Sequence, residues 1–249
     1  MGGQEFMDGL VTASREHISF LNAVHLCVKD LYSNTVDLKY AIAEYVGGWL
    51  PMLNCCIDSV TMTERIQRKT ACVVPVPPLD VAWVWYLHKL DPKSYQTDCC
   101  QWYGHILDAP LGVSPFRYTS AVSSRVDHEF YPCASMYDEF IERISAIASK
   151  QSSFLWNVRS PEFGDTCFLR ESVSRYETML KLAKNDPKEC TAVSYAVENV
   201  WRAHLSFPRQ YLEDCLRLTG RCVDHDSIHG TIIRDGTVLS TPLFIMMQS

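Results

Sequence analysis

One motif occurs twice in this chain of 249 residues, and the repetition constrains the fold more than any other feature. Eight residues recur in the same order, each 116 positions later. The first copy consists of Trp85, His88, Pro92, Tyr95, Asp98, Cys99, Gly104 and Asp108, and the second of Trp201, His204, Pro208, Tyr211, Asp214, Cys215, Gly220 and Asp224. Eight identities in 24 aligned positions exceed the roughly one or two that chance would supply, so the sequence predicts a tandem duplication.

Two weaker similarities precede the motif in each half. Residues 19–24 resemble residues 153–158, and two apolar stripes share the spacing 0, 4, 7 and 11. The stripes are Leu38, Ile42, Tyr45 and Trp49 in the first half and Leu169, Val173, Tyr176 and Leu180 in the second. This spacing places each stripe on one face of an α-helix that packs inward, so we expect a mainly α fold of two tandem helical units.

The motif itself predicts a helix, a tight turn and a second helix. Trp85 and His88 lie three positions apart and share a helix face, whereas Pro92 cannot continue that helix. Asp91 is a good N-cap for a new helix, and Gly104 suits its C-terminal stop. The structural residues of the motif are Trp85, Pro92, Tyr95 and Gly104, with Trp201, Pro208, Tyr211 and Gly220 in the second copy. The second copy has a poorer cap, in residues 206–207.

Other elements follow from local patterns. A helix is expected over roughly residues 9 to 31, with Ile18, Leu21, Val24 and Val28 on its buried face. Residues 231–234 and 237–240, joined by Asp235–Gly236, predict a C-terminal β-hairpin with a type I′ turn. The expected division is a helical unit at 9–112, a connector at 113–134, a second helical unit at 135–229, and a hairpin and tail at 230–249.

Composition excludes several classes of protein. The net charge is −6 and the sequence has no basic run, so charge alone argues against nucleic acid as a partner. No stretch is apolar for long enough to span a membrane, and the N-terminus lacks the pattern of a secretory signal, so we expect a cytoplasmic protein. Eleven cysteines, an odd number with no CxxC pair, favour free thiols over a disulfide framework.

Two pairs are the strongest chemical candidates: His88 with Asp98, and His204 with Asp214. A histidine held by a carboxylate is typical of general-base catalysis and of metal sites. The alternative is structural, with each imidazole bonded inside the turn. We favour the structural reading, because a turn that defines the fold also explains the duplicated aromatic residues and glycines.

A second metal candidate is Cys222, His225 and His229, spaced C-x2-H-x3-H. A structural zinc site needs a fourth ligand, and the sequence offers no C-x2-C partner, so a solvated loop is the favoured reading and no cofactor is expected. Exposed aromatic residues could alternatively stack on the bases of RNA. The sequence has no nucleophile elbow, phosphate loop or dinucleotide fingerprint.

The segment from Pro78 to Cys99, followed by residues 103–108, resembles the glycine-rich domain-containing protein family (GRDP-like). The resemblance spans roughly residues 10 to 230, and its W-x2-H-x3-P-x2-Y-x2-D pattern occurs twice. It implies a mainly α-helical fold and a link, mostly in plants, to growth, stress and hormone responses, with no catalytic reaction. The family's Trp-His-x-His has Tyr86 or Arg202 at its first histidine here, which argues against an inherited metal site. Longer relatives carry further domains whose functions do not transfer.

The leading hypothesis is a non-enzymatic helical scaffold or adaptor that binds another protein, possibly within a regulatory or stress-response complex. Its expected partner-binding residues are the apolar run Leu243, Phe244, Ile245, Met246 and Met247. The alternative is a metal-dependent or acid–base enzyme that uses His88 and His204. RNA binding is the third hypothesis.

Overall fold

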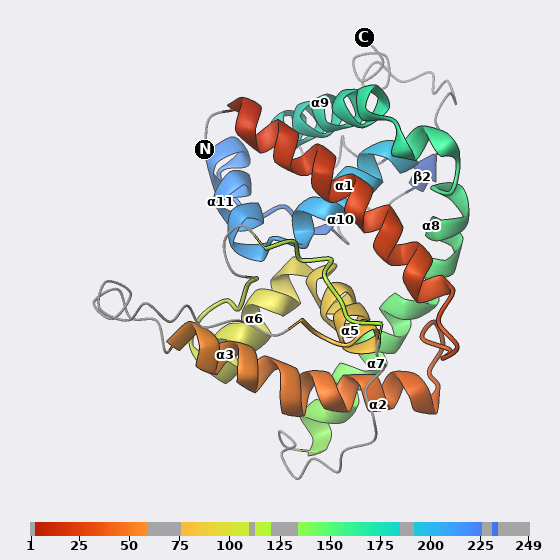
Figure 1. Cartoon of the computed structure of the whole chain (residues 1–249). Helices are drawn as coiled ribbons and strands as arrows, with labels where there is room; N and C mark the ends of the chain where they lie inside the picture. Colours follow the sequence, from red (N-terminus) through yellow and green to blue (C-terminus); the bar gives the residue numbers. More distant parts are fainter. Residues whose placement is uncertain are drawn as a thin grey trace, which may run out of the picture.

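The chain folds into packed α-helices with one short pair of strands, which confirms the mainly α prediction (Figure 1). The computed structural model describes residues 3–58, 76–109, 113–120, 134–184, 192–225 and 231–233. The described residues up to 109 are called the first half below, and those from 134 onward the second half.

The first half contains α1 (Gly3–His25), α2 (Val36–Glu44), a π-helical turn η1 (Tyr45–Trp49), α3 (Leu50–Asp58), α5 (Leu79–Lys89) and α6 (Pro92–Tyr103). The second half contains α7 (Ala134–Ser149), α8 (Gln151–Asn157), a 3-10 turn η2 (Pro161–Gly164), α9 (Thr166–Ala183), α10 (Tyr195–Leu205) and α11 (Pro208–Thr219). Both predicted stripes face the core. Seven of their eight residues are fully buried, and Trp49 is 5% exposed.

The two motif copies form helix–turn–helix corners with matching bounds. Corner one is α5 and α6, and corner two is α10 and α11, with each helix beginning and ending 116 positions after its counterpart. Asp91 caps α6 by accepting a hydrogen bond from the amide of Ser94 (3.0 Å), whereas Phe207 gives α11 no side-chain cap, as the sequence predicts. Both second helices begin with proline and end at a left-handed glycine, Gly104 or Gly220.

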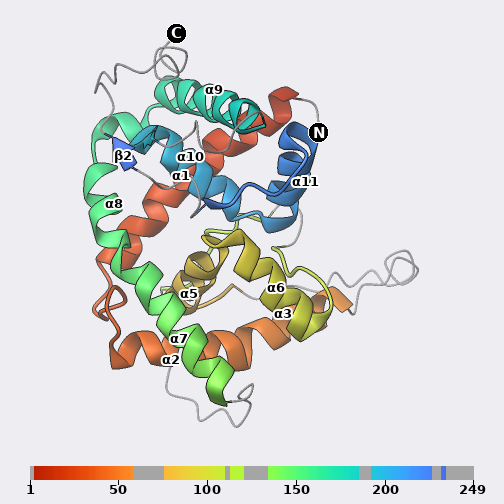
Figure 2. The ribbon, with the colours of Figure 1, turned by 180° about the vertical axis from the view of Figure 1, so that it is seen from behind.

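The first helix of each half packs on the other half. Helix α1 lies against α9 and α10, and α7 lies against α5 and α2, an arrangement visible from both sides (Figures 1 and 2). The boundaries expected for the two units, 9–112 and 135–229, remain predictions. In the folded chain, however, α1 and α7 each contribute to the packing of the opposite half.

Helix α1 ends earlier than expected, at His25 instead of near residue 31. Val28, which the stripe predicted to be buried, is 97% exposed. The chain turns after α1 and buries Leu31, whose carbonyl accepts a hydrogen bond from Nε1 of Trp83 (2.8 Å). The apolar spacing predicted a helix that was too long, because Leu31 is buried from the turn that follows α1 and not from the helix itself.

The first strand of the predicted hairpin is present, and it pairs with a segment that the prediction did not include. Strand β2 (Thr231–Ile233) pairs in parallel with β1 (Ala192–Ser194), with Thr231 opposite Ala192. The rest of the predicted hairpin, residues 234–240, and the run Leu243 to Met247 lie outside the described residues. Pairing with β1 therefore accounts for the strand signal at residues 231–233.

Two further predictions concern the described residues only. Each described cysteine is a free thiol, with Cys99 and Cys215 buried in the two corners. Across the described ranges, no helix has the length and apolar character that crossing a membrane requires.

Replacing Gly104 or Gly220 with alanine should each lower the free energy of unfolding by about 1 kcal/mol. The backbone φ angles are +77° and +78°, and an added Cβ would meet no atom within 4 Å, so the cost is backbone strain alone. Urea unfolding measures the change. The matched control is Gly9→Ala within α1, where an added Cβ is also unobstructed and the protein should gain about 0.5–1 kcal/mol. An equal loss at Gly9 and Gly104 would contradict this explanation.

Candidate functional site

A buried tyrosine hydroxyl closes corner one. Nε1 of Trp85, on α5, donates a hydrogen bond to the hydroxyl of Tyr95, on α6 (2.9 Å). That hydroxyl in turn donates to the carbonyl of Leu107, beyond the end of α6 (2.9 Å). All three residues are buried, so each polar atom would be costly to leave without a partner. The hydroxyl therefore fixes the angle between the two helices and the path of the chain that follows.

Corner two has the same connection. Nε1 of Trp201 donates to the hydroxyl of Tyr211 (3.1 Å), which donates to the carbonyl of Val223 (2.6 Å). Each of these residues lies 116 positions after its counterpart in corner one. The repeated tryptophan and tyrosine thus have the same structural task in both corners.

The structure brings the first candidate pair together at 3.0 Å, between Nε2 of His88 and Oδ2 of Asp98. Because the carboxylate accepts, Nε2 carries the proton, and Nδ1 accepts from the hydroxyl of Tyr45 on η1 (2.9 Å). Arg143 of α7 forms an ion pair with the same Asp98 oxygen. The imidazole is fully buried, between the rings of Tyr95 and Phe140. Both of its nitrogens are therefore used within the fold.

Burial decides the protonation of this pair. Loss of hydration lowers the pKa of His88 and outweighs the effect of its hydrogen bond to Asp98, which would raise that pKa. Burial also acts to raise the pKa of Asp98, but the hydrogen bond from His88 and the charge of Arg143 hold it below its usual value. The site is therefore a neutral imidazole bonded to an ionised carboxylate.

The second candidate pair is arranged in a similar way, but its two side chains lie farther apart and its carboxylate has different partners. Nε2 of His204 lies 3.4 Å from Oδ2 of Asp214, and the hydroxyl of Tyr176, on α9, bonds its Nδ1 (3.0 Å). Here the carboxylate is bound by residues of its own helix, Arg217 and Gln210, instead of by an arginine from another helix. Burial lowers the pKa of His204, as it does for His88.

The sequence offered a signal for these tyrosine partners, although we interpreted it as packing alone. Tyr45 and Tyr176 occupy the same position of the two apolar stripes, and each bonds the histidine of the corner on which it packs. Arg143 had no comparable signal, because it reaches Asp98 across the two halves from α7.

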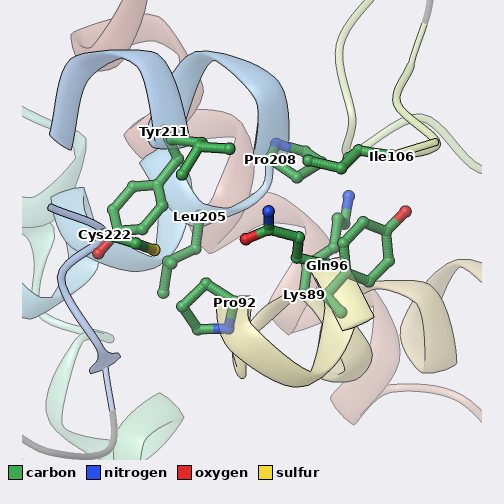
Figure 3. Close-up of a pocket in the computed structure, with 10 residues that line it drawn as sticks. Lys89, Pro92, Gln96, Ile106, Leu205, Pro208, Tyr211 and Cys222 are labelled. Atoms are coloured by element: carbon green, nitrogen blue, oxygen red, sulfur yellow. The ribbon is translucent and has the colours of Figure 1, made fainter. Parts of the chain in front are cut away.

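A hollow lies between the two corners (Figure 3). Its lining consists of five pairs of residues, each 116 positions apart: Lys89 and Leu205, Pro92 and Pro208, Tyr95 and Tyr211, Gln96 and Leu212, and Ile106 and Cys222. It is narrow and partly open to solvent, with room for little more than a water-sized molecule. The corners therefore face each other with equivalent surfaces.

Among the residues that line the hollow, Lys89 alone carries an amine, and its side chain is buried, with the residue only 2% exposed. Its Nζ donates to the carbonyl of Ser206 (3.1 Å) and lies 4.1 Å from the ring centre of Trp85. Burial lowers the pKa of Lys89 to about 7, although the charge of Asp108 acts to raise it. Burial likewise raises the pKa of Asp108.

The metal candidate Cys222, His225 and His229 is only partly described, since His229 lies outside the described residues. Nε2 of His225 is bonded to Oε1 of Glu198 (3.1 Å), and its ring packs on Trp201. Within the described parts of the chain, no group of three or more His, Cys, Asp or Glu side chains is placed to hold a metal ion. His225 instead belongs to a buried polar network.

This network, which the sequence analysis missed, joins the two halves. Arg202 on α10 bonds Glu198 one turn earlier and Gln151 on α8, both at 2.5 Å. The Arg202 guanidinium also interacts with the hydroxyl of Tyr86 on α5. Tyr86 and Arg202 occupy equivalent positions, each directly after the repeated tryptophan of its corner, and here they interact with each other.

The network continues into α1 through His17. Nδ1 of His17 donates to the side-chain oxygen of Asn199 (2.8 Å), and Nε2 accepts from the hydroxyl of Tyr86 (2.9 Å). Burial lowers the pKa of His17 to about 3. A clue was present in the sequence: Glu198 and Arg202 have the spacing of a helical ion pair and are flanked by the apolar residues Val197, Val200, Trp201 and Ala203.

Comparison with known proteins finds similarity to glycine-rich domain-containing proteins. The family model described as glycine-rich domain-containing protein-like matches residues 105–214. Glycine-rich domain-containing protein 2 of Arabidopsis thaliana is 28% identical over 87% of this chain, and glycine-rich domain-containing protein 1 is also 28% identical over 87%. The chain spans 29% and 28% of the lengths of these relatives, respectively. No solved structure matches the chain significantly.

Replacing Lys89 with methionine should remove a pH dependence of stability. Folded protein binds the Lys89 proton below about pH 7, whereas the unfolded chain binds it up to its ordinary pKa of 10.5. Unfolding therefore takes up a proton in this window, and the wild-type free energy of unfolding should rise from pH 7 to 9 by roughly 1 kcal/mol per pH unit.

Urea unfolding at several pH values tests this expectation. The Lys89→Met protein should show a flat profile, whereas Lys93→Met, which removes an exposed amine, should keep the wild-type slope. A wild-type profile that is itself flat would show that Lys89 titrates normally.

Replacing Arg202 with methionine should cost about 3–5 kcal/mol, because Glu198 would remain as a buried charge without its arginine. The double variant Arg202→Met/Glu198→Leu should recover much of this loss. The matched control is Arg175→Met, which breaks a Glu–Arg pair of the same spacing on the surface of α9 and should cost less than about 1 kcal/mol. Equal losses at the two arginines would refute the role given to the buried pair.

Proposed function

The chain belongs to the glycine-rich domain-containing protein-like family, and from this premise we propose that it is a non-enzymatic helical scaffold that mediates protein–protein interaction. We place it in a regulatory or stress-response complex in the cytoplasm. The relatives are several times longer than this chain, so the proposal concerns the shared helical module alone.

One observation carries the non-enzymatic part of the proposal. In corner one, both nitrogens of His88 are bonded, to Tyr45 and Asp98, and the ring is fully buried. A general base must reach the proton that it removes from a substrate, and a metal ligand must offer a lone pair. His88 has neither freedom while these hydrogen bonds hold.

Internal duplication is the second part of the proposal. It is supported by the equal bounds of the corners, by the matching Trp–Tyr–carbonyl hydrogen bonds and by the tyrosine that bonds each histidine. Chemistry that uses a single site would not require both copies to retain the same bonds. An architectural role for the motif explains both copies equally.

The proposed partner-binding segment is the apolar run from Leu243 to Met247, which lies outside the described residues. An apolar run of this length, flanked by the polar residues Thr241 and Gln248, is suited to a hydrophobic groove on another protein. The described helices provide the rigid support from which such a segment would extend.

The experiment is affinity purification with mass spectrometry from cells that express the wild type or a Leu243→Ser/Phe244→Ser/Ile245→Ser variant. The wild type should recover a specific partner that the variant loses, while the two proteins melt at the same temperature. The control Leu216→Ser alters an apolar residue that is 50% exposed on α11 and should retain the partner. An identical set of partners for wild type and variant would count against the proposed segment.

Metal analysis of the purified protein separates the scaffold from the enzyme alternative. The expected result is no stoichiometric metal, because the imidazoles of His88 and His204 are already bonded to tyrosine and aspartate. Zinc or iron at one equivalent, lost in a His88→Gln/His204→Gln variant, would favour the metal-dependent enzyme instead.

A further inference from the structure

Polar contacts fix α1 on the second half at several points along its length. Arg15 donates to the hydroxyl of Thr166 at the start of α9 (2.6 Å), and His17 donates to Asn199 on α10 (2.8 Å). Nearer the N-terminus, Asp8 pairs with Arg170 of α9 (3.4 Å). These contacts set both the register and the rotation of α1 on a surface that belongs to the other half.

Helix α7 is held on the first half in a comparable way. Phe140 packs its ring against His88 of α5, with centres 4.9 Å apart, and against Tyr45 of η1, with centres 6.3 Å apart. Arg143, one turn later, forms the ion pair with Asp98 of α6. The candidate site of corner one is thus completed by a helix from the second half.

The corners themselves also bind each other reciprocally. Lys93 of corner one pairs with Asp224, which follows corner two (2.6 Å). At the equivalent positions in the opposite direction, the backbone amide of Arg209 donates to Asp108, which follows corner one (3.2 Å). Two contacts related by exchange of the halves are what an interface between two similar bodies produces.

From these contacts we propose that the two halves are mutual binding partners that exchange their first helices, so that each half carries a surface fitted to the first helix of the other. The partner of each surface is an amphipathic helix of this same chain, with a polar residue, His17 or Arg143, placed to complete a buried hydrogen-bond set. The folded unit is the pair. This inference concerns packing alone and does not depend on the proposed scaffold function or on how the halves arose.

Burial explains why the exchange would be obligatory. His17 is fully buried, and separating the halves would remove it, with α1, from Asn199 of the second half. The apolar face of α1 includes Phe20, Leu21 and Val24, each about 1% exposed, so its loss would also uncover a large part of the core. The second half therefore lacks both the cover for α9 and α10 and the partner of Asn199 when α1 is absent.

The test uses the full chain with a protease recognition sequence placed between residues 120 and 134, cleaved after folding. The two pieces should elute together in gel filtration down to about 1 µM, because an interface that includes whole helices supports affinities tighter than this. The cleaved protein should also retain the circular dichroism spectrum of the intact chain. Separation of the pieces, whether they stay folded or not, would overturn the proposal.

A pair of histidine variants assigns the association to α1. In the cleaved protein, His17→Ala should weaken association by about tenfold or more, since it removes the buried hydrogen bond to the side-chain oxygen of Asn199 across the two halves. His25→Ala, at the exposed end of the same helix, should leave association within about twofold of wild type. Equal effects of the two substitutions would contradict the assignment.

Discussion

The buried hydroxyl of Tyr95, with its counterpart on Tyr211, is the interaction on which the rest of the structure depends. Each hydroxyl accepts from a tryptophan on the first helix of its corner and donates to a carbonyl after the second. Inside a core, a polar group without a partner costs about 1–3 kcal/mol, so three chain segments are held by one atom. Once the corners are fixed, their surfaces can face each other and form the contacts of Lys93 with Asp224 and of Arg209 with Asp108. The surfaces on which α1 and α7 pack are fixed with them.

The candidate histidines extend the same principle. Each imidazole connects a corner to a tyrosine on a neighbouring helix, and in corner one the aspartate also anchors α7 through Arg143. A second buried network connects α1, α5 and α10, and it consists of His17, Tyr86, Glu198 and Arg202. Polar side chains that resemble catalytic groups in the sequence are thus used to specify which helices pack together.

The sequence was sufficient to predict the local elements of this fold. It was insufficient to predict that α1 and α7 each pack on the opposite half. The proline, the Asp91 cap and the two glycines identified both corners, and the spacing from Leu38 to Trp49 identified the buried face of its helix. Val28 was misplaced because a periodic pattern does not show where a helix ends. The contacts of His17 with Asn199 and of Arg143 with Asp98 join residues far apart in the chain, and no local spacing encodes such pairs.

The central claim is that the two histidines are structural, and nitrogen-15 NMR of their imidazoles tests it most directly. His88 and His204 should be neutral, protonated at Nε2, and unchanged between about pH 5.5 and about pH 8, with or without added zinc. Burial lowers both pKa values and tyrosine occupies both Nδ1 atoms. Titration of either ring near pH 6.5, or a shift of both rings on addition of zinc, would contradict the account.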